Sequence, residues 1–242
     1  MNKLKCKRLN KYFLDLVAKR NIKTVEILAD IGCGIRPQNI ISPRVHICCE
    51  PFFEYRDFLS SQLTNKMFAD RSVIVLPLDW EQTLDFFPQG TIDTIFLLDV
   101  IEHLDKSTGL SLLVKSMSTV KHQIVIFTPL GFMPQTHESG VDAWGMNGGN
   151  WQEHKSGWQP EDFPDFDNWS FFISDNYHDV DHDGVKFPEP YGAFWAIYDK
   201  PQSIVRGRFA VFHKLAWTIK TYAKGLYLIA RAVGLWLASK KM

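Results

Sequence analysis

A glycine-rich turn after the first apolar run is the clearest chemical signal in the chain. The run ILADI contains Asp30 and is followed by Gly32-Cys33-Gly34. Glycines at the end of a strand let the backbone turn sharply and approach a ligand without a Cβ clash. A carboxylate at Asp30 can accept hydrogen bonds from an ammonium group or from a network around one. This turn predicts a site for a ligand with a positively charged amino-acid end.

Two further acidic positions follow the next apolar runs. Glu50 lies about 20 residues after the glycines, where a carboxylate can accept hydrogen bonds from both hydroxyls of a ribose. Asp79 and Trp80 follow the third run, where an acid can accept an adenine amino proton while the indole packs on the ring. The alternatives are that Asp79 caps a helix and that Trp80 packs in the core. Together these residues predict an adenosine ligand.

The fourth apolar run ends in DVIEHL, which places Asp99, Glu102 and His103 where the ligand crevice of an open α/β sheet is expected. His103 and the later His154 are the candidate general bases, because histidine titrates near working pH. The alternatives are that His103 only orients a loop and that Glu102 pairs with the following helix.

A nicotinamide- or flavin-dependent oxidoreductase is disfavoured by the same turn. The dinucleotide fingerprint requires a third glycine where Pro37 stands. It also does not usually place a carboxylate two residues before the first glycine.

The pattern of apolar runs predicts the elements that position these residues. Short β-rich runs alternate with helical or polar stretches, which is typical of a buried parallel sheet. Helices are expected over 3–20, 55–66 and 107–119, and any helix within 32–44 must be very short because Pro37 and Pro43 lie there. Strands are expected at 25–31, 45–49, 73–76, 91–98, 123–127, 169–174 and 193–198. The predicted fold is α/β, a Rossmann-like, doubly wound, mostly parallel seven-stranded sheet with a last antiparallel hairpin.

In this order, DIGCG, Glu50, LDW and DVIEHL resemble the class I S-adenosylmethionine-dependent methyltransferases over residues 25–130. The segments HKSGWQPEDF (154–163) and FWAIYDKP (194–201) are similar to bacterial small-molecule members of types 11 and 12 found near cell-surface polysaccharide genes. The resemblance implies S-adenosylmethionine as cofactor and S-adenosylhomocysteine as product. The implied cofactor-binding residues are Asp30, Gly32, Cys33, Gly34, Glu50, Asp79, Trp80 and Asp99.

The resemblance also implies a substrate side. Residues 131–168 are rich in glycine, tryptophan and proline, a composition typical of functional loops. Trp144, Trp151 and Trp158 are the expected substrate-binding residues, because an indole can stack on a sugar or ring. The implied reaction is methyl transfer to a small or lipid-linked acceptor such as a cell-envelope saccharide precursor. The alternative is a non-catalytic binding or assembly module anchored by its C-terminal helix.

Charge divides the chain into two predicted parts. Lysine plus arginine and aspartate plus glutamate both number 27, but residues 203–242 hold eight basic residues and no acidic one. We predict a methyltransferase domain over 1–202 and a basic amphipathic helical tail over 203–242. The longest apolar run of the tail is too short to span a membrane. The expected partners of the tail are therefore an anionic membrane surface, a second copy of the chain or the domain itself. We expect no nucleic-acid partner.

Cysteines and acidic residues complete the expectations. The four cysteines lack zinc-ligand spacing and are expected to be reduced thiols, and the charged N-terminus lacks a signal-peptide core. We therefore expect a cytoplasmic protein, with the inner face of the membrane as the alternative location. The acidic segment 178–189 has Pro190 where a calcium loop needs glutamate, so we expect an acidic turn and no metal site.

Overall fold

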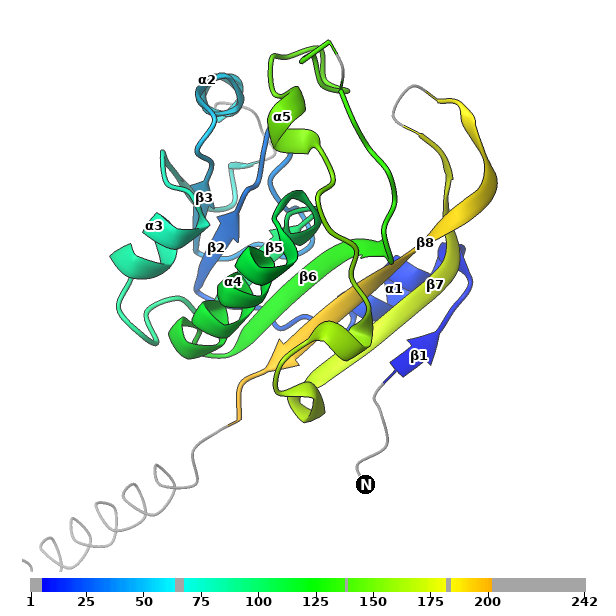
Figure 1. Cartoon of the computed structure of the whole chain (residues 1–242). Helices are drawn as coiled ribbons and strands as arrows, with labels where there is room; N and C mark the ends of the chain where they lie inside the picture. The colour runs from blue at the N-terminus through cyan, green and yellow to red at the C-terminus, as the bar shows by residue number, and fades with distance from the viewer. Residues whose placement is uncertain (1–5, 64–67, 138, 182–183, 202–242) are drawn as a thin grey trace, which may run out of the picture. The chain divides into compact units, whose positions relative to one another are not determined.

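The computed structural model describes residues 6–63, 68–137, 139–181 and 184–201. These residues form one mixed β-sheet with helices packed on it (Figure 1). Among them, eight strands lie in the order β1-β7-β8-β6-β5-β2-β3-β4. The parallel part comprises β2 (Ile27–Ile31), β3 (Val45–Cys49), β4 (Ser72–Leu76), β5 (Thr94–Leu98) and β6 (Gln123–Leu130). Met1–Lys200 forms one compact unit.

The last two strands form a long antiparallel hairpin. Strand β8 (Lys186–Asp199) pairs antiparallel with β6, from Gln123 opposite Asp199 to Leu130 opposite Gly192. Strand β7 (Trp169–Val180) pairs antiparallel with β8, and its register shifts near His178. The predicted fold class, a mostly parallel Rossmann-like sheet ending in an antiparallel hairpin, is confirmed.

The N-terminal prediction is partly wrong. The helix expected over 3–20 begins only at α1 (Lys11–Lys19), where the Asn10 side chain accepts a hydrogen bond from the Tyr12 amide and caps the helix. Before it, β1 (Cys6–Arg8) pairs in parallel with β7 and adds an eighth strand to the seven expected. Arg8 forms an ion pair with Asp175, so charged side chains occupy this sheet edge.

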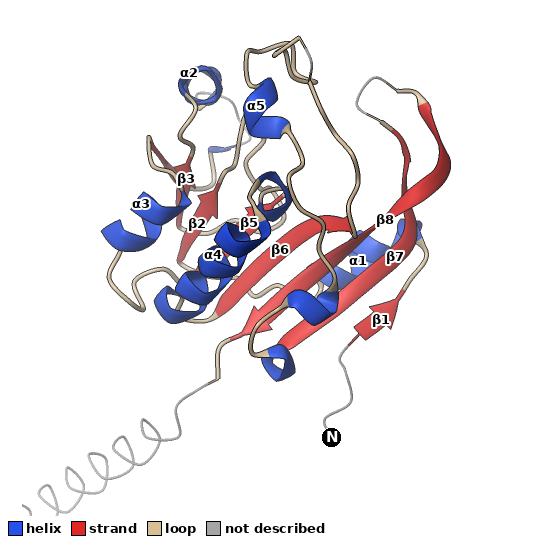
Figure 2. Cartoon of the chain, in the orientation of Figure 1, coloured by secondary structure: helices blue, strands red, loops and turns tan. Residues whose placement is uncertain are grey.

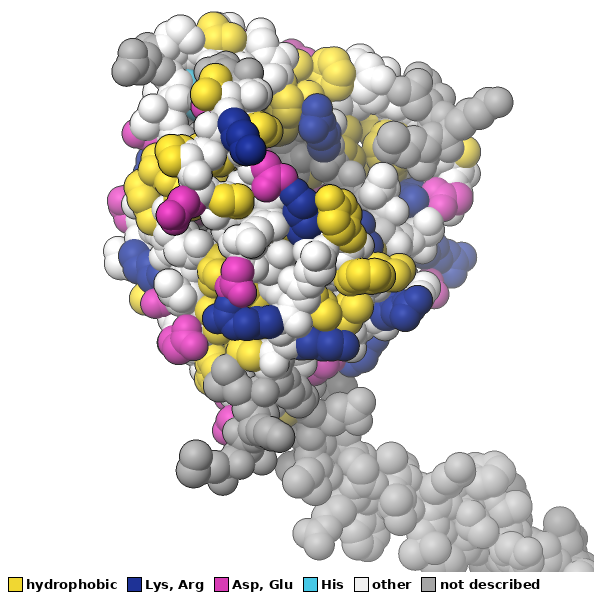
Figure 3. Space-filling model, turned by 90° about the vertical axis from the view of Figure 1, so that its right-hand side faces the viewer, with side chains coloured by type: hydrophobic (Ala, Val, Ile, Leu, Met, Phe, Trp, Pro, Cys, Tyr) yellow, Lys and Arg dark blue, Asp and Glu magenta, His cyan; other side chains and the backbone are white. Residues whose placement is uncertain are grey.

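The face seen from the β1 side carries mixed side chains. In Figure 3, lysine and arginine side chains are interspersed with acidic and hydrophobic ones. No single charge sign dominates what is visible of the described residues.

Helices cover both faces of the sheet (Figure 2). Leu14 and Ala18 of α1 are fully buried against Phe96 and Trp195 on one face. On the other face, α3 (Trp80–Phe86) and α4 (Lys106–Thr119) contact each other and bury Leu84, Leu112 and Leu113 in the larger core. Helix α2 (Phe53–Gln62) buries Leu59 against Cys33 and Cys48, and the end of the helix expected over 55–66 falls outside the described residues.

The connection from β2 to β3 contains no helix within its described residues 32–44, as Pro37 and Pro43 predict. The Gln38 side chain accepts hydrogen bonds from the amides of Ile40 and Ile41 and donates one to the Ile41 carbonyl. One buried amide side chain thus satisfies backbone groups that a helix would otherwise pair.

Residues 131–168 form a long, largely irregular loop that connects β6 to β7. They contain the short helix α5 (Gly149–Gln152) and two 3₁₀ turns, Pro160–Asp162 and Phe166–Asn168. Trp158 bridges back to Leu130 and Gly131 at the end of β6, which anchors the far end of this loop.

Some expectations fall wholly or partly outside the described residues. The tail over 203–242 lies outside them, as do His182 and Asp183 of the acidic turn. In the part of the chain that is described, no helix has the length and apolar character needed to cross a bilayer. All four cysteines are described and carry free thiols, as predicted.

Candidate active site

The glycine turn follows β2 in a left-handed backbone conformation. Gly32 and Gly34 have φ angles of 66° and 54°, which favour glycine. The Gly32 amide donates to the Cys49 carbonyl at 2.8 Å, which fixes the turn against β3. A Cβ on Gly32 would lie 3.0 Å from Val100 Cγ2, and one on Gly34 would lie 2.8 Å from the Trp144 ring. Both positions therefore require glycine for conformation and for space.

Glu50 supports this turn from the end of β3. Its Oε2 accepts a hydrogen bond from the Gly34 amide at 2.9 Å, and its Oε1 accepts one from the Phe52 amide at 2.9 Å. Burial raises the pKa of Glu50, while these two amides act in the opposite direction. Each carboxylate oxygen retains a second lone pair, so Glu50 can still accept hydrogen bonds from a ligand.

Asp30 lines neither of the two cavities at the carboxyl edge of the sheet, so of its two expected roles the structure favours a contact with a surrounding network over a direct contact with a ligand. Its carboxylate is buried and accepts hydrogen bonds from the Gln38 amide at 2.6 Å and from His46 Nε2 at 3.1 Å. Burial alone would lower the pKa of His46, but hydrogen bonds to Asp30 and Cys48 raise it to about 9. In this structure the cationic partner of Asp30 is therefore His46, and Asp30 acts behind the turn as a positioning residue.

Two cavities meet at the carboxyl edge of the sheet, and together they form the cleft. The larger, about 420 Å³, and the smaller, about 150 Å³, share four lining residues: Gly32, Asp99, His103 and Gln152. The cleft lies at the position expected for ligands in open α/β sheets. Gly32 of the glycine turn therefore borders both cavities.

The smaller cavity brings together residues predicted to bind adenosine. Glu50, Asp79 and Trp80 all line it: Glu50 follows β3, and Asp79 and Trp80 follow β4 at the start of α3. Asp79 also caps α3: its carboxylate accepts a hydrogen bond from the Gln82 amide at 2.8 Å, and the Asp79 amide donates one to Gln82 Oε1 at 3.1 Å. Trp80 also packs against the main core. Asp79 is therefore a helix cap and Trp80 a core residue, as the structural alternatives expected, and both also line the smaller cavity.

Asp99 borders both cavities at the end of β5. It has a φ angle of 52°, a conformation that is uncommon outside glycine. Its side chain is open to the cleft, but the surrounding protein atoms desolvate it and raise its pKa to about 7. A carboxyl group with this pKa can take up and release a proton near neutrality.

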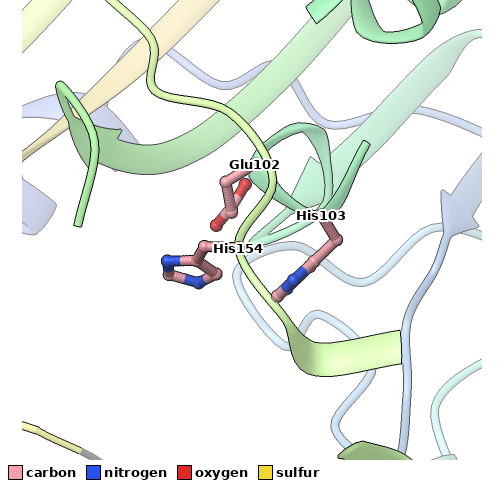
Figure 4. A group of neighbouring side chains, drawn as sticks. All are labelled: Glu102, His103 and His154. Carbon is pink, nitrogen blue, oxygen red and sulfur yellow. The ribbon is translucent and has the colours of Figure 1, made fainter. Parts of the chain in front are cut away.

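Glu102, His103 and His154 lie together in the wall of the larger cavity (Figure 4). The ring centroids of His103 and His154 are 5.0 Å apart. Burial, with a smaller contribution from His154, lowers the pKa of His103 to about 4, and burial also lowers the pKa of His154. Burial and the nearby Asp99 charge raise the pKa of Glu102. Both histidines are therefore neutral at pH 7, and His103 is a weak general base.

The three predicted substrate tryptophans take three different positions. Trp144 lines the larger cavity and packs on the glycine turn, with the Arg36 guanidinium 5.8 Å from its ring centroid. Trp151 is 49% exposed and lines the smaller cavity, on the side expected for adenosine.

The prediction for Trp158 is wrong. Its side chain is fully buried in the main core, and its indole N–H donates to the Ile101 carbonyl at 3.1 Å and to Ser156 Oγ at 2.9 Å. An indole with no exposed surface cannot stack on a substrate. Aromatic composition alone does not separate loop residues that face a cleft from those that anchor the loop.

Sequence reasoning missed several residues of the cleft. Tyr55 lines the smaller cavity and donates a hydrogen bond to Asp142 at 2.5 Å, which ties α2 to the loop. Gln152 lines both cavities. Two cations and a histidine complete this set: Arg36 and His178 in the larger cavity and Lys155 in the smaller. Gln152 and Lys155 lie in the 131–168 loop and His178 in the acidic segment 178–189, so the sequence singled out their segments without singling out these residues as part of the cleft.

Comparisons with known proteins bear on the fold. No family model matches the chain, and no curated protein matches it in sequence. Among solved structures, the YcgJ protein of Bacillus subtilis is 11% identical with a TM-score of 0.53, and the match covers 79% of this chain and 99% of that one. Phosphoethanolamine N-methyltransferase 2 of Haemonchus contortus, solved with S-adenosylhomocysteine, is 13% identical with a TM-score of 0.50, covering 78% of this chain and 52% of that one. At these identities the likeness concerns the backbone, and the chain has the fold of the class I S-adenosylmethionine-dependent methyltransferases.

Proposed function

We propose that this protein transfers a methyl group from S-adenosylmethionine to a small or lipid-linked acceptor, with a cell-envelope saccharide precursor as the acceptor class. The observation that carries the proposal is the alignment of the glycine turn, Glu50 and Asp99 along one cleft at the carboxyl edge of the sheet. This arrangement accommodates a nucleoside with a charged tail.

The residues of the cleft fit the cofactor. Glu50 retains lone pairs for the two ribose hydroxyls, and Asp79 and Trp80 offer an acceptor and an aromatic face in the same cavity. Gly32 and Asp99 line both this cavity and the larger one, where the remainder of the cofactor would lie. When bound, the cofactor would supply an electrophilic methyl group on a sulfonium.

The chain's own contribution is alignment, exclusion of water and movement of a proton. In-line displacement requires the acceptor to lie on the far side of the methyl group, and the larger cavity provides that space. A hydroxyl acceptor must also lose its proton. Asp99, with a pKa of about 7, suits this role better than His103, with a pKa of about 4.

The acceptor class rests on the larger cavity and on the sequence resemblance of residues 154–163 and 194–201. The aromatic face of Trp144 and the polar groups of Arg36, Gln135 and His178 suit a sugar, which stacks on rings and forms many hydrogen bonds. Incubation with labelled S-adenosylmethionine and a panel of sugar nucleotides and lipid-linked saccharides tests this class. Label on a phosphobase or a peptide alone would reject it.

Calorimetric titration of the full chain with S-adenosylhomocysteine and, separately, with NADH tests the cofactor. We expect micromolar binding of the first ligand alone. The variant Gly32→Ala should bind S-adenosylhomocysteine at least about tenfold more weakly, because its Cβ would press on Val100, which lines the smaller cavity, and its φ angle is strained. Gly90→Ala is the matched control, since Gly90 also has a positive φ but no atom lies near its missing Cβ. Equal losses in both variants, or binding of NADH alone, would reject the proposal.

A further inference from the structure

We propose that Glu102, His103 and His154 form a binding site for a divalent transition-metal ion in the wall of the larger cavity. One potential ligand atom from each residue lies within 4.8 Å of the other two. Figure 4 shows the three side chains close together, from two segments, the 3₁₀ turn Ile101–His103 and the 131–168 loop. Spacing along the sequence does not predict this site, because the two histidines lie 51 positions apart in the sequence.

Backbone carbonyls fix which nitrogen of each histidine is available. Nδ1 of His103 lies 3.1 Å from the Glu153 carbonyl oxygen, and Nδ1 of His154 lies 2.6 Å from the Met133 carbonyl oxygen. A carbonyl oxygen only accepts, so Nδ1 must donate in both rings. The neutral form of each ring then presents the lone pair of Nε2. Metal-binding histidines are usually oriented by such a second hydrogen bond.

Glu102 supplies an independent observation. Its side chain is 2% exposed, and its Oε2 accepts a hydrogen bond from Thr128 Oγ1 at 3.0 Å. Its Oε1 is buried and has no hydrogen-bond partner within the described chain. A buried polar atom without a partner costs free energy and calls for an explanation. A cation held jointly by Glu102 and the two imidazoles would satisfy that oxygen.

The donor set determines the class of ion. Two imidazole nitrogens and one carboxylate suit Mn²⁺, Fe²⁺ or Zn²⁺, whereas Mg²⁺ and Ca²⁺ prefer oxygen ligands alone. Metal–ligand bonds of about 2.1 Å place neighbouring ligand atoms about 3–4 Å apart, so binding draws the side chains slightly inward.

The three residues leave the remaining coordination positions facing the larger cavity, because all three line it. This inference rests on the proposed function in one respect: the open positions would hold an oxygen of the acceptor. A bound cation lowers the pKa of a coordinated hydroxyl and orients it. The site would therefore select oxygen acceptors over amines.

Metal binding is tested on the full chain after treatment with EDTA. Titration calorimetry with MnCl₂, ZnCl₂ and MgCl₂ should show one site that takes Mn²⁺ or Zn²⁺ more tightly than Mg²⁺. Electron spin-echo measurements on bound Mn²⁺ should detect coupling to imidazole nitrogen. Glu102→Gln and His154→Gln should each weaken binding by at least about tenfold. His122→Gln, at an exposed histidine near the opposite end of β6, is the control and should bind like the unaltered chain.

Several outcomes would overturn the site: no binding of Mn²⁺ or Zn²⁺ below about 100 μM, no nitrogen coupling, or undiminished binding in both cluster variants. Circular dichroism and Tm confirm that each variant is folded. Glu102→Gln preserves the side-chain shape if His154→Gln does not fold. Titration of S-adenosylhomocysteine in the same samples separates the two proposals. Cofactor binding without metal binding rejects the metal site alone, and metal binding without cofactor binding rejects the proposed function alone.

Discussion

At the scale of single residues, Asp99 combines a left-handed backbone with a carboxyl group that titrates near neutrality. Its pKa of about 7 in the folded chain exceeds the value of about 3.9 in an unfolded chain. The folded state therefore holds this proton more tightly. Stability from this group is present below about pH 4 and is lost as the pH rises to about 7.

Asp99→Asn should consequently raise the Tm of the ligand-free chain at pH 8, by about 2–4 °C, and change it little at pH 4. Asparagine tolerates the left-handed conformation, so the backbone is preserved. The measurement is thermal unfolding at both pH values in a chelating buffer. Asp165→Asn is the control, because Asp165 has a φ angle of 53° but lies exposed outside the cleft. An equal increase in Tm at both pH values would contradict the raised pKa of Asp99.

We expect opposite effects when Trp158 and Trp151 are replaced by alanine: one variant should lose stability and the other should lose ligand binding. Trp158→Ala should reduce the free energy of unfolding by about 3–5 kcal/mol, because it empties a fully buried site. Trp151→Ala should leave stability nearly unchanged and weaken binding of S-adenosylhomocysteine, because Trp151 is half exposed in the smaller cavity. Urea denaturation and calorimetry on both variants measure the two effects. A stable, binding-deficient Trp158→Ala chain would show that the loop is seated differently.

At the scale of elements, helix α4 meets the 131–168 loop at Gly109. An alanine in a helix interior normally improves stability by up to about 1 kcal/mol relative to glycine. At Gly109 the added Cβ would lie 2.4 Å from Trp158 Cζ2, a buried ring held by two hydrogen bonds.

Gly109→Ala should therefore destabilise the chain, by about 1–3 kcal/mol, instead of stabilising it. The comparison is Ser107→Ala on the same helix, at a position that is not packed against the loop. Chemical denaturation of both variants gives the sign. An increase in stability for Gly109→Ala would mean that Trp158 can move away at little cost.

Two substitutions at Asp79, the N-cap of α3, distinguish its role as a helix cap from a role of its negative charge. Asp79→Asn should keep the helix cap, because an amide oxygen also accepts from the Gln82 amide, whereas Asp79→Ala should cost about 1 kcal/mol. If Asp79 also contacts adenine through an ionised oxygen, both variants should weaken S-adenosylhomocysteine binding. Thermal unfolding and calorimetry distinguish the two roles, and unchanged affinity in both would leave Asp79 as a cap only.

The strands of the parallel part could be predicted to within about three residues, because buried parallel strands are nearly continuous apolar runs. Strand β1 could not be predicted, since CKR has no apolar pattern and pairs only because β7 offers an edge. The glycine turn and Glu50 were identifiable from local spacing. Glu102 and His154 could be named as separate candidates, but their proximity could not be predicted, and neither could the burial of Trp158 or the partner of Asp30, because these contacts join segments that are distant in sequence.

At the scale of the whole molecule, we propose that the basic segment 203–242 binds the surface of an anionic membrane. Each lysine or arginine near an anionic bilayer contributes about 1 kcal/mol. A full chain with Lys220→Glu, Lys224→Glu and Arg231→Glu should therefore lose at least about tenfold of its partitioning onto phosphatidylserine vesicles. Co-sedimentation measures the loss, with phosphatidylcholine vesicles as the control. Equal sedimentation of both chains would remove membrane association from the proposal.

The loop over 131–168 contributes walls to both cavities: Trp144 to the larger, Trp151 to the smaller and Gln152 to both. Any ligand that orders this loop in one cavity lowers the conformational entropy that a second ligand must still lose in the other. The two affinities are then thermodynamically linked, and the linkage is reciprocal: the factor by which the nucleoside ligand tightens acceptor binding equals the factor by which the acceptor tightens nucleoside binding.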